Sequence, residues 1–273
     1  MMRRVTLGLI ACCALGMGMA APASADVLAD IKAKGKIVAA TEMHFAPFDI
    51  LEDGQYKGIC KDLFDEVAKE LGVKAEYLDL PWQSVLPGLE AKKFDIVNAP
   101  VTITAERAKR YAFTLPIGNA TVAFVKKTGD ASISKAEDLA GKAAGSQKGS
   151  AQLDQLKAFS AKLPKPVDVR EYVNQDEALA DLGAGRIQAV VNSMPLMGYA
   201  AKQRPEVFTL VMPPFGEPKY FAWVGRKDED TASLITAVNA ALVKMHGDGR
   251  LKAINEKWLG AAPELPTTMP AVE

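Results

Sequence analysis

The feature that most limits the fold of this chain is an alternation of short apolar strands with amphipathic helices. In the first series, strands are expected at 36–41, 74–78 and 94–97, with helices between them at 61–71 and 84–92. A βαβαβ order of this kind predicts parallel strands with helices packed on the faces of the sheet. We therefore expect an α/β fold.

A second series of the same kind follows Pro116 and Gly118. Its expected strands are 122–126, 142–144, 167–172 and 187–191, with helices at 150–161 and 175–184. A proline-rich turn at 213–218 interrupts the alternation. One further strand and two helices are expected after it, at 220–225, 231–246 and 249–258.

The repeated series predicts two lobes. The chain is expected to cross from one lobe to the other near 119–122 and to return near 215–221. We expect lobe 1 to comprise 26–119 and a return with the C-terminal helices over 217–262, lobe 2 to comprise 120–216, and a tail to follow at 263–273. Ligands of open α/β sheets bind outside the carboxyl ends of the strands. The cleft between the lobes is therefore the expected binding site.

The N-terminal segment, residues 1–25, has the pattern of a cleaved signal peptide. Arg3-Arg4 precedes an apolar stretch at 5–19, and Ala23-Ser24-Ala25 is a small-x-small cleavage pattern. The apolar stretch is shorter than the roughly 20 residues that span a membrane. We expect export to the periplasm; the alternative is a lipid anchor at Cys12, because 9–12 resembles a lipobox.

The charge balance gives no indication of a polyanionic partner. Lys and Arg together number 33, as do Asp and Glu, and no basic run extends beyond Lys126-Lys127. Removing residues 1–25 takes away Arg3 and Arg4 and no acid, which leaves the mature chain with a small negative charge. Nucleic-acid binding is therefore not expected.

The titratable sulfur and imidazole groups do not indicate a cofactor. Cleavage after Ala25 leaves Cys60 as the only cysteine, so no intramolecular disulfide can form. We interpret Cys60 as a small structural side chain at a helix start, although neighbouring Lys61 could lower its pKa. His44 and His246 have no metal-ligand spacing with other residues. No metal or cofactor is expected.

Five segments in order along the chain resemble the periplasmic solute-binding proteins that feed polar amino acids to ABC importers, family 3 of the extracellular solute-binding proteins. They lie at 41–72, 81–114, 138–152, 177–193 and 245–260. The resemblance implies a type II periplasmic-binding-protein fold, in which each lobe is a mostly parallel sheet flanked by helices. It also implies two hinge strands, closure on a ligand, a membrane permease as partner and a monomeric, non-enzymatic chain.

The stretch at 98–107, "NAPVTITAER", resembles the carboxylate-binding wall of that family. Arg107 occupies the position of the arginine that clamps the ligand's carboxylate, for which a planar guanidinium is suited. Thr102 stands where a hydroxyl and a backbone N–H assist. Thr104 is expected to cap the helix that carries Arg107. The alternative is that Arg107 is a solvated side chain, as Lys109 and Arg110 are expected to be.

Other site positions carry over from the resemblance one at a time. The Pro100 carbonyl stands where the ligand's ammonium donates, and Phe45 and Trp82 stand where aromatic rings enclose the ligand's side chain. On lobe 2, Ser150 and Ala151 lie at a helix N-terminus, which favours an anion. Gln147 and Gln152 lie beside them in the sequence.

One position departs from the family pattern. After "GRIQAVV" the family places an aspartate that pairs with the ligand's α-ammonium, whereas this chain has Asn192-Ser193. A neutral Ser193 cannot supply a charge-assisted hydrogen bond. Either Glu42 on the other lobe replaces that acid, or the ligand lacks a standard α-ammonium group.

The function expected from this resemblance is capture of a small carboxylate, an amino acid or a derivative, for an ABC importer. Two alternatives stay open. A partner protein of a periplasmic dehydrogenase would tolerate a degraded amine site, but Arg107 is retained. A dehydratase of cyclic dicarboxylates would need an acid in the cleft to protonate a leaving hydroxyl. Ser193 removes the lobe 2 candidate for that acid and leaves Glu42.

Overall fold

Lobe 1 is built on a six-stranded sheet with the order β5-β1-β6-β14-β7 and β8 beside β14. Its strands are β1 (Lys36–Thr41), β5 (Lys74–Asp79), β6 (Ile96–Thr102), β7 (Tyr111–Phe113), β8 (Gly118–Asn119) and β14 (Tyr220–Arg226). β1 pairs in parallel with β5 and β6, and β14 pairs antiparallel with β6, β7 and β8. In this described sheet, therefore, β14 alone runs against the other strands. The computed structural model describes residues 26–271.

Helices cover both faces of that sheet because its strands bury side chains on both sides. They are α1 (Val27–Lys34), α2 (Ile59–Leu71), α3 (Trp82–Glu90), α4 (Ala105–Arg110), α8 (Glu229–Gly247) and α9 (Arg250–Leu259). Ile37 and Ala39 of β1 belong to the core with α2 and α8, whereas Ala40 belongs to the core under α3. This alternation along one strand has the period of two that a β-strand imposes.

Lobe 2 contains a five-stranded sheet in the order β11-β10-β12-β9-β13. Its strands are β9 (Val122–Lys127), β10 (Ala143–Gln147), β11 (Asp168–Tyr172), β12 (Ala189–Ser193) and β13 (Phe208–Phe215). β10 is parallel to β11 and β12, and β9 is antiparallel to both of its neighbours. In both lobes, then, the strand that runs against the rest is one that the chain enters after crossing from the other lobe.

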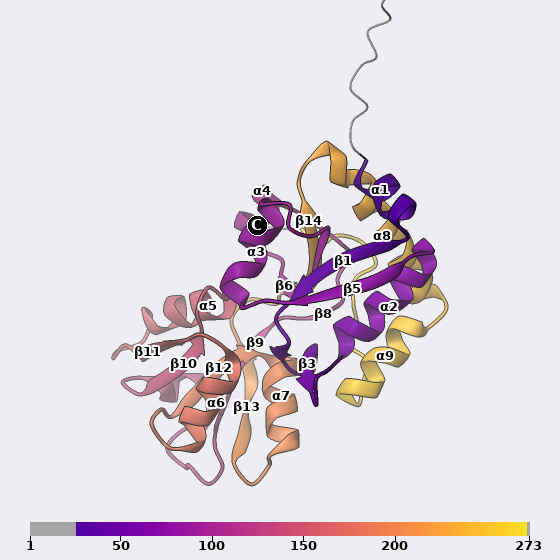
Figure 1. The fold of residues 1–273 in the computed structure, drawn as a ribbon. Coiled ribbons are helices and arrows are strands. Elements are labelled where there is room, and N and C mark those ends of the chain that lie inside the picture. The colour runs from indigo at the N-terminus through magenta and orange to yellow at the C-terminus, as the bar shows by residue number, and fades with distance from the viewer. Residues whose placement is uncertain (1–25, 272–273) are drawn as a thin grey trace, which may run out of the picture.

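The helices of lobe 2 are α5 (Ala151–Ser160), α6 (Gln175–Gly183) and α7 (Met194–Gln203), preceded by a 3₁₀ turn, η1 (Ala136–Leu139). Leu156 of α5 packs in one core, and Ala178 of α6 and Leu196 of α7 pack in the other, so the helices cover opposite faces. Figure 1 shows this lobe at the lower left and lobe 1, with α1, α2, α8 and α9, at the upper right.

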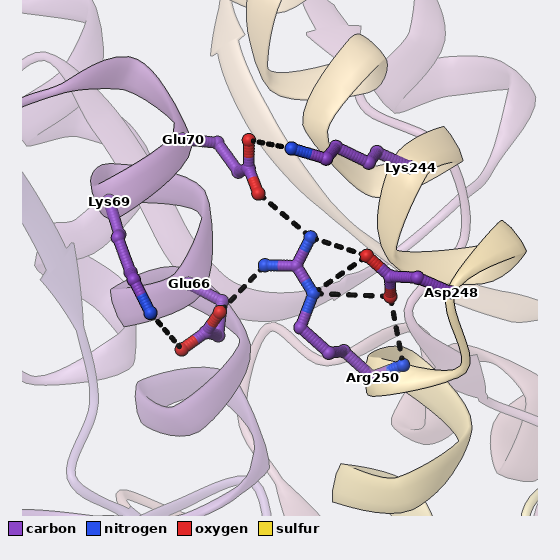
Figure 2. A network of polar contacts seen from close by, with 6 residues as sticks. All are labelled: Glu66, Lys69, Glu70, Lys244, Asp248 and Arg250. Atoms are coloured by element: carbon purple, nitrogen blue, oxygen red, sulfur yellow. Dashed lines mark hydrogen bonds and ion pairs between the residues drawn. The ribbon is translucent and has the colours of Figure 1, made fainter.

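The C-terminal helices are fastened to α2 by a network of charged side chains (Figure 2). Arg250 contacts Glu66 at 2.6 Å, Glu70 at 2.8 Å and Asp248 at 2.7 Å. Lys244 of α8 contacts Glu70 at 2.8 Å. Asp248, Glu66 and Glu70 raise the pKa of Arg250. The network joins α2 to the consecutive helices α8 and α9, which follow it by more than 150 residues in the sequence.

The predicted α/β architecture is confirmed, and the end of one predicted strand differs from the prediction. β6 continues to Thr102 instead of ending at Val97, although it contains Pro100. Its pairing with β1 stops at Val97, and the register with β14 shifts between Ala222 and Val224. Pro100 therefore lies where the ladder is already irregular, which is where a strand tolerates proline.

The prediction missed α7, β13 and a small sheet of β2 (His44–Phe45), β3 (Asp49–Glu52) and β4 (Gln55–Lys57). Pro195 lies in the first turn of α7. Backbone N–H groups there have no acceptor within the helix, so the missing N–H of a proline costs no hydrogen bond. β13 is an edge strand, so it accommodates prolines in its last residues.

No helix in the described part of the chain is long and apolar enough to cross a membrane. The predicted signal peptide, with Cys12, lies outside the described residues.

Candidate ligand-binding site

A cavity of about 350 Å³ lies between the two lobes. Lobe 1 contributes residues that follow β1, belong to β6, or begin α3 and α4, and lobe 2 contributes the end of β10 and the start of α5. The lining residues are Glu42, Phe45, Trp82, Ala99, Pro100, Thr102, Arg107, Phe221, Gln147, Ser150, Ala151 and Gln152. β1 and β6 are parallel in the lobe 1 sheet, and β10 is parallel to β12 in the lobe 2 sheet. The cavity is lined from the carboxyl ends of β1, β6 and β10, which is where open α/β sheets bind ligands.

The structure brings together every predicted site residue except Ser193. Ser193 is the last residue of β12 and precedes α7, and it is fully buried away from the cavity lining. Its backbone N–H donates to Asn192 Oδ1 at 2.7 Å, and Asn192 Nδ2 donates to Gln175 Oε1 at 2.7 Å. Both neutral side chains are thus part of the lobe 2 interior, and neither lines the cavity.

Arg107 is held by its own helix and by both lobes. Its backbone N–H donates to Thr104 Oγ1 at 3.2 Å, so Thr104 caps α4 as predicted. Nη1 donates to the Thr102 carbonyl at 3.3 Å, and Nη2 donates to the Gly149 carbonyl of lobe 2 at 3.1 Å. Burial lowers the pKa of Arg107. Arginine side chains nevertheless stay protonated in proteins.

The surroundings of Arg107 suit an anion. Its guanidinium lies 5.5 Å from the centroid of the Trp82 ring. Ser150 Oγ accepts the Leu153 N–H at 3.1 Å and so caps α5, whose first turn begins at Ala151. The first N–H groups of a helix have no intrahelical acceptors and attract negative charge. Arg107 and the α5 N-terminus therefore face the same cavity from opposite lobes.

The acidic end of the cavity is Glu42, which is 5% exposed. Its Oε2 accepts a hydrogen bond from Gln147 Nε2 of lobe 2 at 2.6 Å. Burial raises the pKa of Glu42 to about 7, against the opposing effects of the Gln147 hydrogen bond and of His44. Among the described residues that line the cavity, Glu42 is the only acid.

Three lining residues, Ala99, Gln152 and Phe221, were not among the predicted site residues. Gln152 Nε2 donates to Thr102 Oγ1 at 3.1 Å, another contact between the lobes. Phe221 pairs in register with Thr102 and packs edge-on against Phe45 with ring centroids 6.1 Å apart. The available signal for Phe221 was its position directly after the second lobe crossing, on the strand expected to return to lobe 1.

Cys60 is completely buried at the start of α2, and burial raises the pKa of its thiol. The structure thus supports the structural interpretation of this cysteine, and the idea that Lys61 lowers its pKa is wrong.

Two α/β lobes that enclose a cavity lined by a guanidinium, a carboxylate and aromatic rings define a solute-binding protein. Comparison with known sequences agrees: a profile of the bacterial extracellular solute-binding proteins, family 3, matches residues 37–261. The chain belongs to this family, and its function is that of a substrate-binding protein. Membership of an extracellular family also agrees with the expected export.

Individual relatives support the same fold and function. The chain is 31% identical over 263 residues to the L-cystine-binding protein TcyJ of Escherichia coli K12, covering 95% of this chain and 96% of that protein. It is 32% identical over 225 residues to an L-arginine-binding protein of Pseudomonas aeruginosa, covering 80% and 85% of the two chains. A solved structure, the ancestral amino acid-binding protein AncCDT-1, described as a precursor of cyclohexadienyl dehydratase, superposes with a TM-score of 0.78. That protein is 32% identical, and the match covers 85% of this chain and 99% of that one.

Proposed function

We propose that this protein binds a small zwitterion, an α-amino acid or a close derivative, and delivers it to the membrane permease of an ABC importer. The observation that carries the proposal is that Arg107 and Glu42, one cation and one acid, line a single cavity between the lobes. Relatives are named for L-cystine and L-arginine, and both compounds are amino acids.

The carboxylate of the ligand is assigned to Arg107, Thr102 and the first turn of α5. Arg107 offers charge-assisted hydrogen bonds, which are roughly twice as strong as neutral ones. Thr102, which has a hydroxyl, and Ala151, the first residue of α5, line the same cavity. A carboxylate bound here would contact both lobes at once and so favour the closed arrangement.

The ammonium of the ligand is assigned to Glu42 and the carbonyl of Pro100. The family's aspartate position holds Ser193, which is neutral and does not line the cavity. Among the described residues that line the cavity, lobe 2 supplies no acid. A cation bound beside Glu42 would lower the pKa of this carboxyl and so keep it ionised. Glu42 thereby takes the role that the family's lobe 2 aspartate fills, from the opposite wall.

The remaining walls set the size and character of the ligand. Phe45, Trp82 and Phe221 are aromatic, and Gln147 and Gln152 are neutral amides. Apolar rings and neutral amides therefore surround the two charged groups of the cavity.

A thermal-shift screen with matched ligands tests the proposal. Amino acids, opines, betaines and dicarboxylates identify the class, and three arginine compounds separate the two ends of the zwitterion. L-Arginine keeps both charged groups, agmatine lacks the carboxylate, and Nα-acetyl-L-arginine lacks the α-ammonium. We expect amino acids to give the largest shifts and each truncated analogue to bind more weakly than its parent. Dicarboxylates outranking every amino acid would contradict the assignment.

The setting of this function follows from the family. We propose that residues 1–25 are removed on export, that the mature chain acts as a monomer in the periplasm, and that the crossings near 119–122 and 215–221 form the hinge between lobes of 26–119 with 217–262 and 120–216. A lipid anchor at Cys12 is the alternative for its attachment. Mass spectrometry of the exported protein separates these, because cleavage leaves Asp26 at the N-terminus.

A second candidate function rests on the raised pKa of Glu42, about 7, because a carboxyl with that pKa can act as a general acid at neutral pH. AncCDT-1 is described as a precursor of a dehydratase, although it is itself an amino acid-binding protein. We propose binding without catalysis, and turnover of a cyclohexadienyl carboxylate by this protein would overturn that view. The role of dehydrogenase partner is the less favoured, since the cavity keeps both charged groups.

A further inference from the structure

One backbone carbonyl of lobe 2, that of Gly149, accepts two hydrogen bonds from lobe 1. Trp82 Nε1 donates to it at 3.1 Å, and Arg107 Nη2 donates to it at 3.1 Å. Trp82 and Arg107 also contact each other, with the guanidinium 5.5 Å from the ring centroid. Three groups from α3, α4 and the loop before α5 thus meet at a single point between the lobes.

The Gly149 carbonyl is fixed in position by its own turn. Gly149 has a φ of +74°, a conformation that favours glycine over residues with a Cβ. The residues on either side are bonded to the lobe 2 backbone: the Lys148 N–H donates to Tyr172 O at 2.9 Å, and the Ser150 N–H donates to Gln147 O at 3.2 Å. The carbonyl is therefore presented to lobe 1 by a turn whose backbone is already hydrogen-bonded.

The same three residues lie on the boundary between two spaces. The ligand cavity is lined by Trp82 and Arg107, and an outer groove of about 1200 Å³ is lined by Gly149 and Arg107. Arg107 and Ala151 line both. The hydrogen bond from Trp82 to Gly149 thus spans the wall that separates the cavity from the groove.

We propose that Trp82, Gly149 and Arg107 form a latch that holds the two lobes together and seals the ligand cavity from the outer groove. This inference rests on the proposed binding function, since a latch matters only if a solute is enclosed. Arg107 has two roles, as carboxylate partner and as latch member. The indole N–H of Trp82 serves only the latch, so the two roles can be separated by substitution.

The substitution Trp82→Phe makes this separation. It keeps an aromatic ring beside Arg107 and removes the indole N–H that reaches Gly149. Trp82 is only partly buried, so the variant is expected to fold. The matched control is Trp258→Phe, which removes an indole N–H whose acceptor, Asp62 at 2.8 Å, belongs to the same lobe.

The latch is first tested by ¹⁵N NMR of the three tryptophan indole groups. The signal that disappears in Trp82→Phe identifies Trp82. We expect its N–H to exchange with water more slowly than an exposed indole in the presence of L-arginine or L-cystine. Unprotected exchange of this N–H in the free protein and with both amino acids would overturn the latch, whether or not the ligand assignment is right.

The second test is the dissociation rate of L-arginine and L-cystine, measured by stopped flow. One neutral hydrogen bond corresponds to a change of about three- to tenfold in rate or affinity. We expect Trp82→Phe to raise the dissociation rate by that factor with little change in the association rate, and Trp258→Phe to leave both rates unchanged. Equal dissociation rates for wild type and Trp82→Phe would overturn the proposal. Failure of the ligand assignment would differ, because substitution of Arg107 would then weaken affinity only by the factor of about three to ten that one latch hydrogen bond supplies.

Discussion

The two walls of the ligand cavity differ in charge. Lobe 1 presents Arg107 and Glu42 together with aromatic rings, whereas lobe 2 presents Gln147, Ser150, Ala151 and Gln152, none of which is charged. The difference extends into the interior. Glu42 and Asp49, the acidic side chains that the described part of the chain buries, both belong to lobe 1. In the binding mode proposed above, charge on lobe 1 selects the ligand, and neutral hydrogen bonds from lobe 2 close over it.

This division teaches why the loss of an acid at the end of β12 need not abolish recognition of a zwitterion. With both charged groups on lobe 1, a ligand can be oriented before closure. Lobe 2 then adds the contacts from Gln147 to Glu42 and from Gln152 to Thr102. Substitutions on the two walls should consequently have effects of different size and on different rate constants.

The largest effect is expected from Arg107→Ala. Removing one partner of a desolvated charge pair costs several kcal/mol, so affinity for the identified amino acid should fall at least about 100-fold in calorimetry. Arg110→Ala is the control, because Arg110 is exposed and pairs with Glu90 on the surface. A loss of no more than about tenfold in Arg107→Ala, which its latch hydrogen bond alone would explain, would show that the carboxylate binds elsewhere.

The next effect is a pH dependence that Glu42 should confer. With its pKa near 7 in the free protein, Glu42 is increasingly protonated below pH 7 and no longer attracts an ammonium. Affinity should rise from pH 5 toward pH 8, by up to about tenfold per unit where protonation dominates. Glu42→Gln should bind more weakly at pH 8 and show a nearly flat profile. A steep profile retained in Glu42→Gln would assign the titration to another group.

A smaller effect is expected on the neutral wall. Gln152→Ala removes the bond to Thr102 and should weaken binding about three- to tenfold, mainly through faster dissociation. Its association rate and its sensitivity to salt should match those of wild type. Gln155→Ala, one turn further along α5, serves as control. A Gln152→Ala effect as large as that of Arg107→Ala would remove the proposed difference between the walls.

The smallest effect concerns stability rather than binding. Burial raises the pKa of Asp49 to about 8, far above that of an unfolded aspartate, and its carboxyl accepts a hydrogen bond from Tyr56. The folded state therefore binds a proton that the unfolded state releases, and stability should fall as pH rises from about 4 to 8. Asp49→Asn should weaken this slope in melting curves. A slope equal to that of wild type would exclude Asp49 as its source.

Proline explains which parts of the fold could be predicted from the sequence. The alternation of strands and helices in the sequence was sufficient to predict the two α/β series. By contrast, two errors came from treating proline as the end of a strand. We predicted that β6 ends before Pro100, and we predicted no strand at β13, which contains Pro213. The tertiary setting decides otherwise, because β6 is unpaired on one side at Pro100 and β13 lies at an edge. Neither property can be read from a single sequence.

The site shows a similar limit. Arg107, Thr102 and Glu42 lie in motifs at strand ends that resemble those of the family. The sequence was therefore sufficient to name them as candidate site residues. Phe221 reaches the cavity only because β14 pairs with β6 after the second crossing. Ser193 was expected beside the ligand because it occupies the family's aspartate position, but it lies in the lobe 2 interior. The motifs could not predict contacts that depend on how the strands and lobes pack against one another.

The most direct test of the account is the binding of matched ligands to Glu42→Gln by calorimetry. If L-arginine proves to be a ligand, wild type should prefer it over Nα-acetyl-L-arginine by about tenfold or more, since the acetylated compound lacks the α-ammonium. The same matched pair applies to whichever amino acid binds. The account predicts that Glu42→Gln loses most of this preference, while the preference for L-arginine over agmatine remains. A Glu42→Gln variant that still discriminates against the acetylated compound as wild type does would contradict it, because another group would then hold the ammonium.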